Sequence, residues 1–203
     1  MKIFAIGRNY GAHAAELGNP QASKPIVFMK PATALLADGS VFTIPSFSTD
    51  VHYELELVLR IAKTAKNVLA SNAWDYVKHY TLGIDFTARD LQSELKEQRL
   101  PWELSKAFDG SAIIGSKWFD INPATFKSVE FELLQDGKSK QKATAAEMIF
   151  GVPALIKFVS TYFTLEVGDL LYTGTPAGVG KVSGGEQYIG MLGEQKVLDF
   201  MIR

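Results

Sequence analysis

The chain has 203 residues, of which 47% are hydrophobic and 21% charged, a composition typical of a globular protein. Its formal net charge is only −1, and its basic residues are scattered, which argues against a nucleic-acid-binding surface. The lack of cysteine excludes disulfides, thiolate metal sites and a cysteine nucleophile. The first apolar run is too short for a signal peptide, and none approaches the roughly 20 residues that span a bilayer. We therefore expect a single domain over residues 1–203, located in the cytoplasm, with no membrane partner.

The first predicted elements are short. Residues 1–6 predict a strand, residues 10–17 a helical turn that Gly18-Asn19-Pro20 closes, and residues 26–31 a brief strand that ends at a proline. The segment VHYELELVLRI, residues 51–61, alternates apolar and polar side chains, which predicts one strand with a buried face.

The later elements mix strands and helices without regular alternation. They are a buried strand (80–86), a helix (87–98), a hairpin (129–144) that turns on Asp136-Gly137, a helix (153–163) and a strand (169–176) that leads into a glycine-rich loop. Strands outnumber helices, and the βαβ pattern of a parallel sheet is absent. The sequence therefore predicts a β-rich α+β fold with short peripheral helices.

Three carboxylates in two segments suggest a metal site. Glu54 and Glu56 stand two residues apart on a predicted strand, so both side chains point to one face. Asp85 interrupts the apolar run YTLGIDF, where an unpaired carboxylate is costly to bury. Oxygen ligands of this kind favour Mg²⁺, Mn²⁺ or Ca²⁺. The alternative is a solvated strand face for the glutamates and a turn or capping role for the aspartate.

His13 and Glu16 are three residues apart on the predicted helical turn, where the carboxylate can hydrogen-bond the imidazole. Such a bond fixes the ring tautomer and raises the basicity of the other nitrogen, as a general base requires. Lys106 lies among apolar neighbours in LSKAFDGS and could stabilise a developing oxyanion or enolate. The alternative for all three residues is an ordinary surface position.

Two further groups could bind an anionic substrate. Arg89 and Gln92 share one face of the helix and suit a carboxylate, unless that face is simply solvent-exposed. The loop TGTPAGVG, residues 173–180, offers backbone N–H groups and the Thr175 hydroxyl. It lacks the pattern of a phosphate-binding or dinucleotide loop, and the motifs of zinc hydrolases and serine hydrolases are absent.

Taken together, these segments resemble the fumarylacetoacetate hydrolase family, in particular its short acylpyruvate hydrolase and oxaloacetate decarboxylase branch. The matching segments run in order through nearly the whole chain: GRNYGAHAAEL, PIVFMKP, HYELELVLRI, GIDFTARDLQ, LPWELSKAFDGS, MIFGVP and GDLLYTGTPAGVG. Each is weak alone, but seven in the same order are specific.

The resemblance implies a mixed β-sandwich roll, usually a homodimer, that binds Mg²⁺ or Mn²⁺. It implies metal ligands at Glu54, Glu56 and Asp85. It implies a catalytic group of His13, Glu16 and Lys106, with His13 and Glu16 activating water. It implies substrate-binding positions at Arg8, Arg89, Gln92 and Thr175. Because a lid would decide whether water is excluded or aimed, we also predict that residues 9–20 form a mobile lid bearing the His13–Glu16 pair.

The implied activity is cleavage of the C–C bond of acylpyruvates such as acetylpyruvate or fumarylpyruvate, by way of a metal-bound pyruvate enolate. Decarboxylation of oxaloacetate would form the same enolate. The alternatives are a related hydratase, isomerase or decarboxylase, similar to 2-hydroxyhepta-2,4-diene-1,7-dioate isomerase, or a non-catalytic protein that binds a 2-oxo acid.

Overall fold

The computed structural model describes residues 1–18 and 20–203, and in this part of the chain the strands form three sheets. The largest has the order β2-β1-β13-β6-β7-β9-β3, with β10 also paired to β7. The β1–β13 and β3–β9 pairs are parallel, while β6 and β7 are antiparallel, so the sheet is mixed. Its strands are β1 (Ile3–Gly7), β2 (Ile26–Lys30), β3 (Leu35–Ala37), β6 (Leu55–Ile61), β7 (Val77–Asp85), β9 (Ala112–Ile114), β10 (Phe119–Asp120) and β13 (Leu170–Tyr172).

A second sheet has the order β12-β11-β15-β16-β4, and a small one has the order β14-β5-β8. The second sheet consists of β4 (Val41–Phe42), β11 (Glu130–Gln135), β12 (Lys138–Thr144), β15 (Gln187–Leu192) and β16 (Gln195–Ile202). The small sheet consists of β5 (Val51–Tyr53), β8 (Thr87–Ala88) and β14 (Gly180–Lys181).

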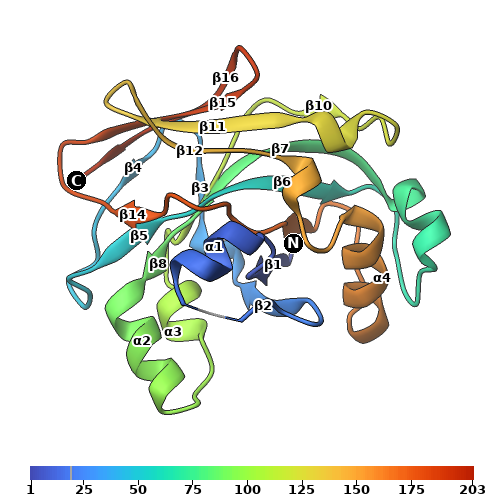
Figure 1. Cartoon of the computed structure of the whole chain (residues 1–203), viewed down its shortest axis with the longest axis horizontal. Helices are drawn as coiled ribbons and strands as arrows, with labels where there is room; N and C mark the ends of the chain where they lie inside the picture. Colours follow the sequence, from blue (N-terminus) through green and yellow to red (C-terminus); the bar gives the residue numbers. More distant parts are fainter. Residues whose placement is uncertain (19) are drawn as a thin grey trace.

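Short helices surround these sheets. The α-helices are α1 (Gly11–Glu16), α2 (Arg89–Glu97), α3 (Glu103–Lys106) and α4 (Val152–Tyr162), and the 3₁₀ helices are η1 (Ala32–Ala34), η2 (Ala70–Tyr76), η3 (Phe126–Ser128) and η4 (Ala145–Glu147). In Figure 1, α2 and α3 lie together on the side of the molecule away from the second sheet, and α4 lies beyond the far end of β6. With 38% strand and 23% helix, the predicted β-rich α+β class is confirmed. No helix in the described ranges is long and apolar enough to cross a membrane.

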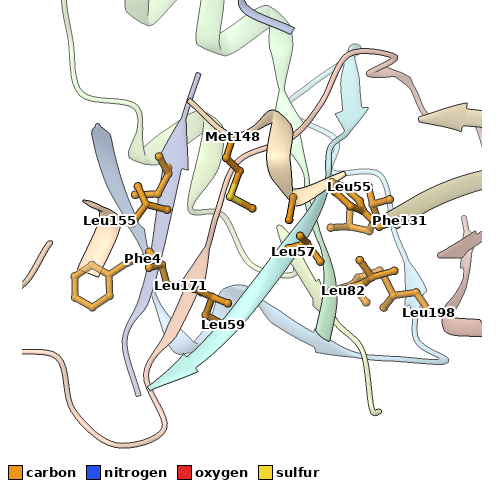
Figure 2. Packing of buried hydrophobic residues seen from close by; sticks show 14 of the residues in the cluster. Phe4, Leu55, Leu57, Leu59, Leu82, Phe131, Met148, Leu155, Leu171 and Leu198 are labelled. Atoms are coloured by element: carbon orange, nitrogen blue, oxygen red, sulfur yellow. The ribbon is translucent and has the colours of Figure 1, made fainter. Parts of the chain in front are cut away.

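The core lies between the largest sheet, the second sheet and α4. Figure 2 shows Leu57 of β6 beside Leu82 of β7, with Leu59 farther along β6 and with Phe131 and Leu198 of the second sheet facing the same cluster. All five side chains are at most 1% exposed. Burial of apolar area at roughly 25 cal/mol per Å² is what stabilises such a layered arrangement.

The segment 51–61 does not form the single strand that its alternation predicts. It breaks at Glu54 into β5 and β6, which pair with strands of different sheets. The alternation is still present in β6, but both faces of this strand are covered, because Val58 packs in a second apolar cluster. The break matters for function because it lies at the first of the three predicted carboxylates.

The hairpin on Asp136-Gly137 is confirmed as β11 and β12, with positive φ angles of 48° and 76° at the two turn residues. Such angles are those of a tight type I′ turn, which an Asp-Gly pair favours. The hairpin brings Gln141 of β12 into the protein interior, where it is 1% exposed.

Candidate active site

The register of β6 against β7 brings the three predicted carboxylates together. Glu56 lies opposite Gly83, and the Asp85 backbone N–H donates to the Glu54 carbonyl at 2.8 Å. Residues opposite one another in an antiparallel pair point to the same face, as do residues two apart on one strand. Glu54, Glu56 and Asp85 therefore share one face at the end of this strand pair.

A side chain at Gly83 would fill that face. A Cβ there would stand 2.6 Å from the Tyr172 ring and 2.7 Å from Val58. The glycine leaves room for the Tyr172 ring, whose hydroxyl donates to the Ile113 carbonyl at 2.8 Å.

The carboxylate triad, as we call Glu54, Glu56 and Asp85, fits a divalent cation that prefers oxygen ligands. One oxygen of each residue lies within 4.8 Å of the others, and all three residues are buried, at 4%, 1% and 1% exposure. Three buried acidic groups this close repel one another unless positive charge lies between them. The donor set is that of a hard divalent cation, such as Mg²⁺, Mn²⁺ or Ca²⁺, rather than of a soft metal.

Three basic side chains of the protein contact the triad. The Lys106 ammonium, at the end of α3, lies 2.8 Å from Glu54 Oε2 and 2.7 Å from Asp85 Oδ2. Lys30, at the end of β2, lies 2.7 Å from Asp85 Oδ1. Arg89 binds Glu54 Oε1 at 2.5 Å through Nη2 and donates to Gln92 Oε1 at 2.7 Å through Nη1.

The carboxylates differ in protonation because the basic groups are unevenly distributed. Burial would raise the pKa of Glu54, but Lys106 and Arg89 outweigh it and hold that pKa well below its usual range. Burial, with Asp85 and Glu54 nearby, raises the pKa of Glu56 well above its usual range. The hydrogen bond that Glu56 accepts is from the Gly174 N–H, at 2.7 Å. The ionised form of Glu56 would therefore gain most from a nearby cation.

The two buried lysines have pKa values shifted in opposite directions. Burial lowers the pKa of Lys106, but the Asp85 and Glu54 carboxylates more than compensate and raise it overall, so its ammonium stays charged. Burial lowers the pKa of Lys30 even though Asp85 opposes that effect. Lys30 also donates to the Ser111 carbonyl at 2.9 Å and to the Lys106 carbonyl, which ties the end of α3 to β2.

The predicted His13–Glu16 pair is present on α1. His13 Nδ1 lies 3.2 Å from Glu16 Oε2, and Glu16 Oε1 accepts the Gly178 N–H at 3.0 Å. The carboxylate thus connects the helix to the glycine-rich loop. With Nδ1 directed at Glu16, Nε2 is the ring nitrogen left to accept a proton. The predicted lid, residues 9–20, includes Asn19, which lies outside the described residues, and its mobility stays a prediction.

One cavity collects most of the predicted site residues. The site cavity, as we call it, is lined by side chains from β1 to α3: Gly7, Arg8, His13, Leu17, Phe28, Glu54, Arg89, Gln92, Lys96, Trp102 and Lys106. It therefore brings together the predicted base, a triad ligand, Lys106 and the predicted substrate-binding residues Arg8, Arg89 and Gln92. Their roles in binding and catalysis remain predictions.

Thr175 is not among the residues lining the described site cavity. It is buried, and its hydroxyl accepts a hydrogen bond from Gln141 Nε2 at 2.8 Å. Gln141 also donates to the Pro176 carbonyl and accepts from the Leu55 N–H beside the triad, at 2.9 and 2.8 Å. The hairpin thus fixes the glycine-rich loop against the start of β6.

Asn9 holds the same loop from the other side. It is fully buried, and its amide donates to the Thr173 carbonyl at 2.7 Å while accepting the Phe150 N–H at 2.8 Å. Gly174 has a φ of 101°, and a Cβ there would stand 2.7 Å from the Asn9 Cβ. Only glycine allows this close approach, which directs the Gly174 N–H at Glu56.

Comparison with known proteins agrees with this arrangement. A family model described as Fumarylacetoacetate (FAA) hydrolase C-terminal matches residues 2–198. The chain belongs to the fumarylacetoacetate hydrolase family. Two relatives in this family are the mitochondrial oxaloacetate decarboxylase of Dictyostelium discoideum and the mitochondrial oxaloacetate tautomerase fahd-1 of Caenorhabditis elegans. The first is 44% identical over 191 residues, covering 91% of this chain and 85% of the relative. The second is 40% identical over 185 residues, covering 91% and 86%.

A solved structure has the same fold. It is fumarylpyruvate hydrolase from Pseudomonas aeruginosa in complex with Mn²⁺ and pyruvate, with a TM-score of 0.92 and 35% identity. The match covers 100% of this chain and 89% of that chain. The predicted family and fold are confirmed, and the present chain is a member of a family of enzymes.

Sequence reasoning missed Lys30 and Gln141, which contact residues of the site, and Lys96, which lines the cavity. Lys30 had a usable signal, because a lysine that follows the apolar run IVFM and precedes a proline is unusual at a strand end. Lys96 could have been found by extending the helical spacing of Arg89 and Gln92 by one turn. No pattern in the sequence pointed to Gln141, since its role depends on contacts between distant segments.

Proposed function

We propose that this family member is a divalent-metal-dependent hydrolase that cleaves the C3–C4 bond of acylpyruvates, yielding pyruvate and a carboxylic acid. The observation that carries the proposal is the pairing of a buried carboxylate triad with the His13–Glu16 pair, since His13 and Glu54 line the same cavity. A cation without a base would suffice for binding, and a base without a cation would leave the substrate keto group unactivated.

Glu54, Glu56 and Asp85 would hold Mg²⁺ or Mn²⁺, which when bound supplies Lewis-acid polarisation of the substrate's 2-keto oxygen. Arg89 and Gln92 line the cavity beside Glu54 and would orient the substrate carboxylate. Leu17, Phe28 and Trp102 make part of the wall apolar, which limits the water that reaches the substrate.

His13 Nε2 would take a proton from water as the water oxygen attacks the C4 carbonyl carbon. The C3–C4 bond then breaks, its electron pair becomes a pyruvate enolate, and the proton held by His13 returns to C3. Lys106, whose raised pKa keeps it charged, would stabilise the negative charge on the enolate oxygen. Glu16 would stabilise the imidazolium that forms between these steps.

Oxaloacetate decarboxylation is a second candidate, favoured by the 44% identity with the oxaloacetate decarboxylase of Dictyostelium discoideum. Loss of CO₂ from oxaloacetate generates the same enolate without a water nucleophile. One site can serve both reactions because both develop charge at the same oxygen.

An assay with acetylpyruvate and with oxaloacetate, each with Mn²⁺ and with EDTA, tests the proposal. We expect acetylpyruvate to yield equal amounts of pyruvate and acetate with Mn²⁺, and turnover to cease in EDTA. If the protein consumes oxaloacetate but not acetylpyruvate, the hydrolase proposal is wrong and the decarboxylase proposal takes its place. If it consumes neither substrate with Mn²⁺, both proposals are contradicted.

We also propose that the protein is a homodimer, as the family resemblance implies. An apolar hollow beside α2 and α3 supports this, because Phe47 and Leu104 on its wall are 56% and 66% exposed. Exposed apolar patches of this kind commonly mark protein interfaces. Light scattering should give twice the mass of one chain, and a mass of one chain at micromolar concentration would contradict the proposal.

A further inference from the structure

Lys96 lies in the site cavity but belongs to none of the groups described above. It is in the last turn of α2, on the same helix as Arg89 and Gln92. Spacings of three and four residues place Arg89, Gln92 and Lys96 in one row along the helix. At 1.5 Å per residue, the Lys96 backbone is about 10 Å farther along the axis than that of Arg89, which contacts the triad.

An aromatic wall connects the triad to Lys96. The Lys106 ammonium lies 5.1 Å from the Phe28 ring, Phe28 lies 6.1 Å from Trp102, and the Lys96 ammonium lies 5.6 Å from the Trp102 ring. All four side chains line the same cavity. The wall therefore runs from one ammonium to another, with an apolar stretch between them.

The outer end of this cavity has unbalanced positive charge. Among the described residues, Lys96 and Arg8 make no ion pair with a carboxylate, whereas Arg89 and Lys106 both contact Glu54. Arg8 adopts a positive φ of 57°, a costly conformation for a residue that is not glycine. Burial and the nearby Arg8 and Arg89 lower the pKa of Lys96 to about 8, so its charge is held at an energetic cost.

We propose that Lys96, assisted by Arg8, binds the distal carboxylate of a dicarboxylic acylpyruvate, and so makes this site selective for dicarboxylic over monocarboxylic substrates. The inference rests on the proposed function. In this arrangement the 2-oxo acid end of the substrate lies at the triad, and its unsaturated or aliphatic arm lies along Phe28 and Trp102. The cavity has a volume of only about 30 Å³ in this structure, so its lining side chains would move apart to admit the substrate. Fumarylpyruvate has this layout, with a carboxylate at each end, whereas acetylpyruvate ends in a methyl group.

Lys96→Met tests this inference, because methionine keeps the length of the side chain and removes the charge. We expect kcat/KM for fumarylpyruvate to fall about 10- to 100-fold, the scale of a lost hydrogen bond to a charged group. The value for acetylpyruvate should not change, and Lys96→Arg should retain most of the fumarylpyruvate activity. The control is Lys157→Met, which removes an exposed lysine of α4 and should affect neither substrate.

An equal loss on both substrates, or no loss on fumarylpyruvate, would overturn the subsite. Folding is checked by Tm. Since Lys96 is surrounded by other cations, we expect Lys96→Met to melt no lower than the wild type at pH 7.

The pH profile gives a second readout. The ratio of kcat/KM for fumarylpyruvate to that for acetylpyruvate should decline above about pH 8 as Lys96 loses its proton. Using a ratio cancels titrations that affect both substrates equally, including those of the other charged or titratable groups that face this cavity: Arg8, His13, Glu54, Arg89 and Lys106. Lys96→Met should make the ratio flat, and an unchanged decline in this variant would contradict the proposal.

A binding experiment separates failure of the subsite from failure of the proposed function. N-oxalyl-4-aminobutyrate and N-propyloxamate share an oxamate end, but only the first has a distal carboxylate, and its chain is as long as that of fumarylpyruvate. With Mn²⁺ present, Lys96→Met should weaken N-oxalyl-4-aminobutyrate binding about 10- to 100-fold and leave N-propyloxamate binding unchanged. A protein that turns over neither acylpyruvate but shows this difference would refute the hydrolase and retain the subsite. Equal effects on both ligands would refute the subsite alone.

Discussion

Glu56→Gln is expected to reduce turnover by more than about 10³-fold, since it would remove one of the three proposed ligands and, with the cation, several kcal/mol of charge stabilisation. The same change should not harm the metal-free fold. The Glu56 carboxylate is buried and its one described hydrogen bond is to the Gly174 N–H, which the glutamine oxygen can also accept. Calorimetric titration with Mn²⁺ and steady-state kinetics measure the two effects.

The stability of this variant depends on pH in a defined direction. The folded state raises the pKa of Glu56 above its unfolded value, so the wild type loses stability as pH rises from about 4.5 toward the folded pKa. At pH 7 without metal, Glu56→Gln should therefore melt higher than the wild type, and the difference should shrink as pH falls toward 4.5. A lower Tm for the variant at pH 7 would contradict this account of Glu56.

Asp85→Asn is the matched control, because it removes a charge from the same triad with different neighbours. Lys30 and Lys106 both contact Asp85, and both are buried. Removing one partner of a buried ion pair typically costs about 3–5 kcal/mol. We expect this variant to lose metal binding and to melt well below the wild type. Equal stability of the two variants would mean that Lys30 and Lys106 do not stabilise Asp85 more than Glu56.

His13→Ala is expected to lower acylpyruvate hydrolysis by about 10²–10⁴-fold, the usual effect of losing a general base. Mn²⁺ binding should persist, because His13 lies on α1 and none of the triad carboxylates belongs to that helix. Decarboxylation of oxaloacetate needs no water nucleophile, so it should be affected far less. Parallel assays of the two reactions, with Mn²⁺ affinity measured on the same preparation, give the result.

His79→Ala is the control for this variant. His79 pairs with the exposed Asp120 at 2.9 Å and does not line the described site cavity. It should leave both reactions unchanged. Full acylpyruvate hydrolysis by His13→Ala would remove the His13–Glu16 pair from the mechanism, and an equal loss of both reactions would indicate a structural role for His13.

Local sequence patterns predicted the parts of the fold that depend on local physics. The Asp-Gly turn predicted the hairpin because those two residues tolerate positive φ angles. Glu54 and Glu56 were expected on one face because strand side chains alternate. The strand break at Glu54 was missed, since it arises where the chain leaves the partners of β5 for those of β6.

The approach of Asp85 to the glutamates depends on register, which a single sequence does not reveal. The pairing of Glu56 with Gly83 decides it, and a slip of one residue would turn Asp85 to the opposite face. The family resemblance, rather than periodicity, predicted that these residues converge. Lys30 and Gln141 reach the site across the fold, by contacts between segments 55 and 86 residues apart in sequence.

The position of a bound cation is the most direct test of the account. Crystals of the protein grown with Mn²⁺ can be measured at a wavelength where manganese scatters anomalously. The account predicts one strong anomalous peak, within bonding distance of oxygens from Glu54, Glu56 and Asp85. A structure at the same Mn²⁺ concentration with no peak among these oxygens, or with manganese bound only elsewhere, would contradict it.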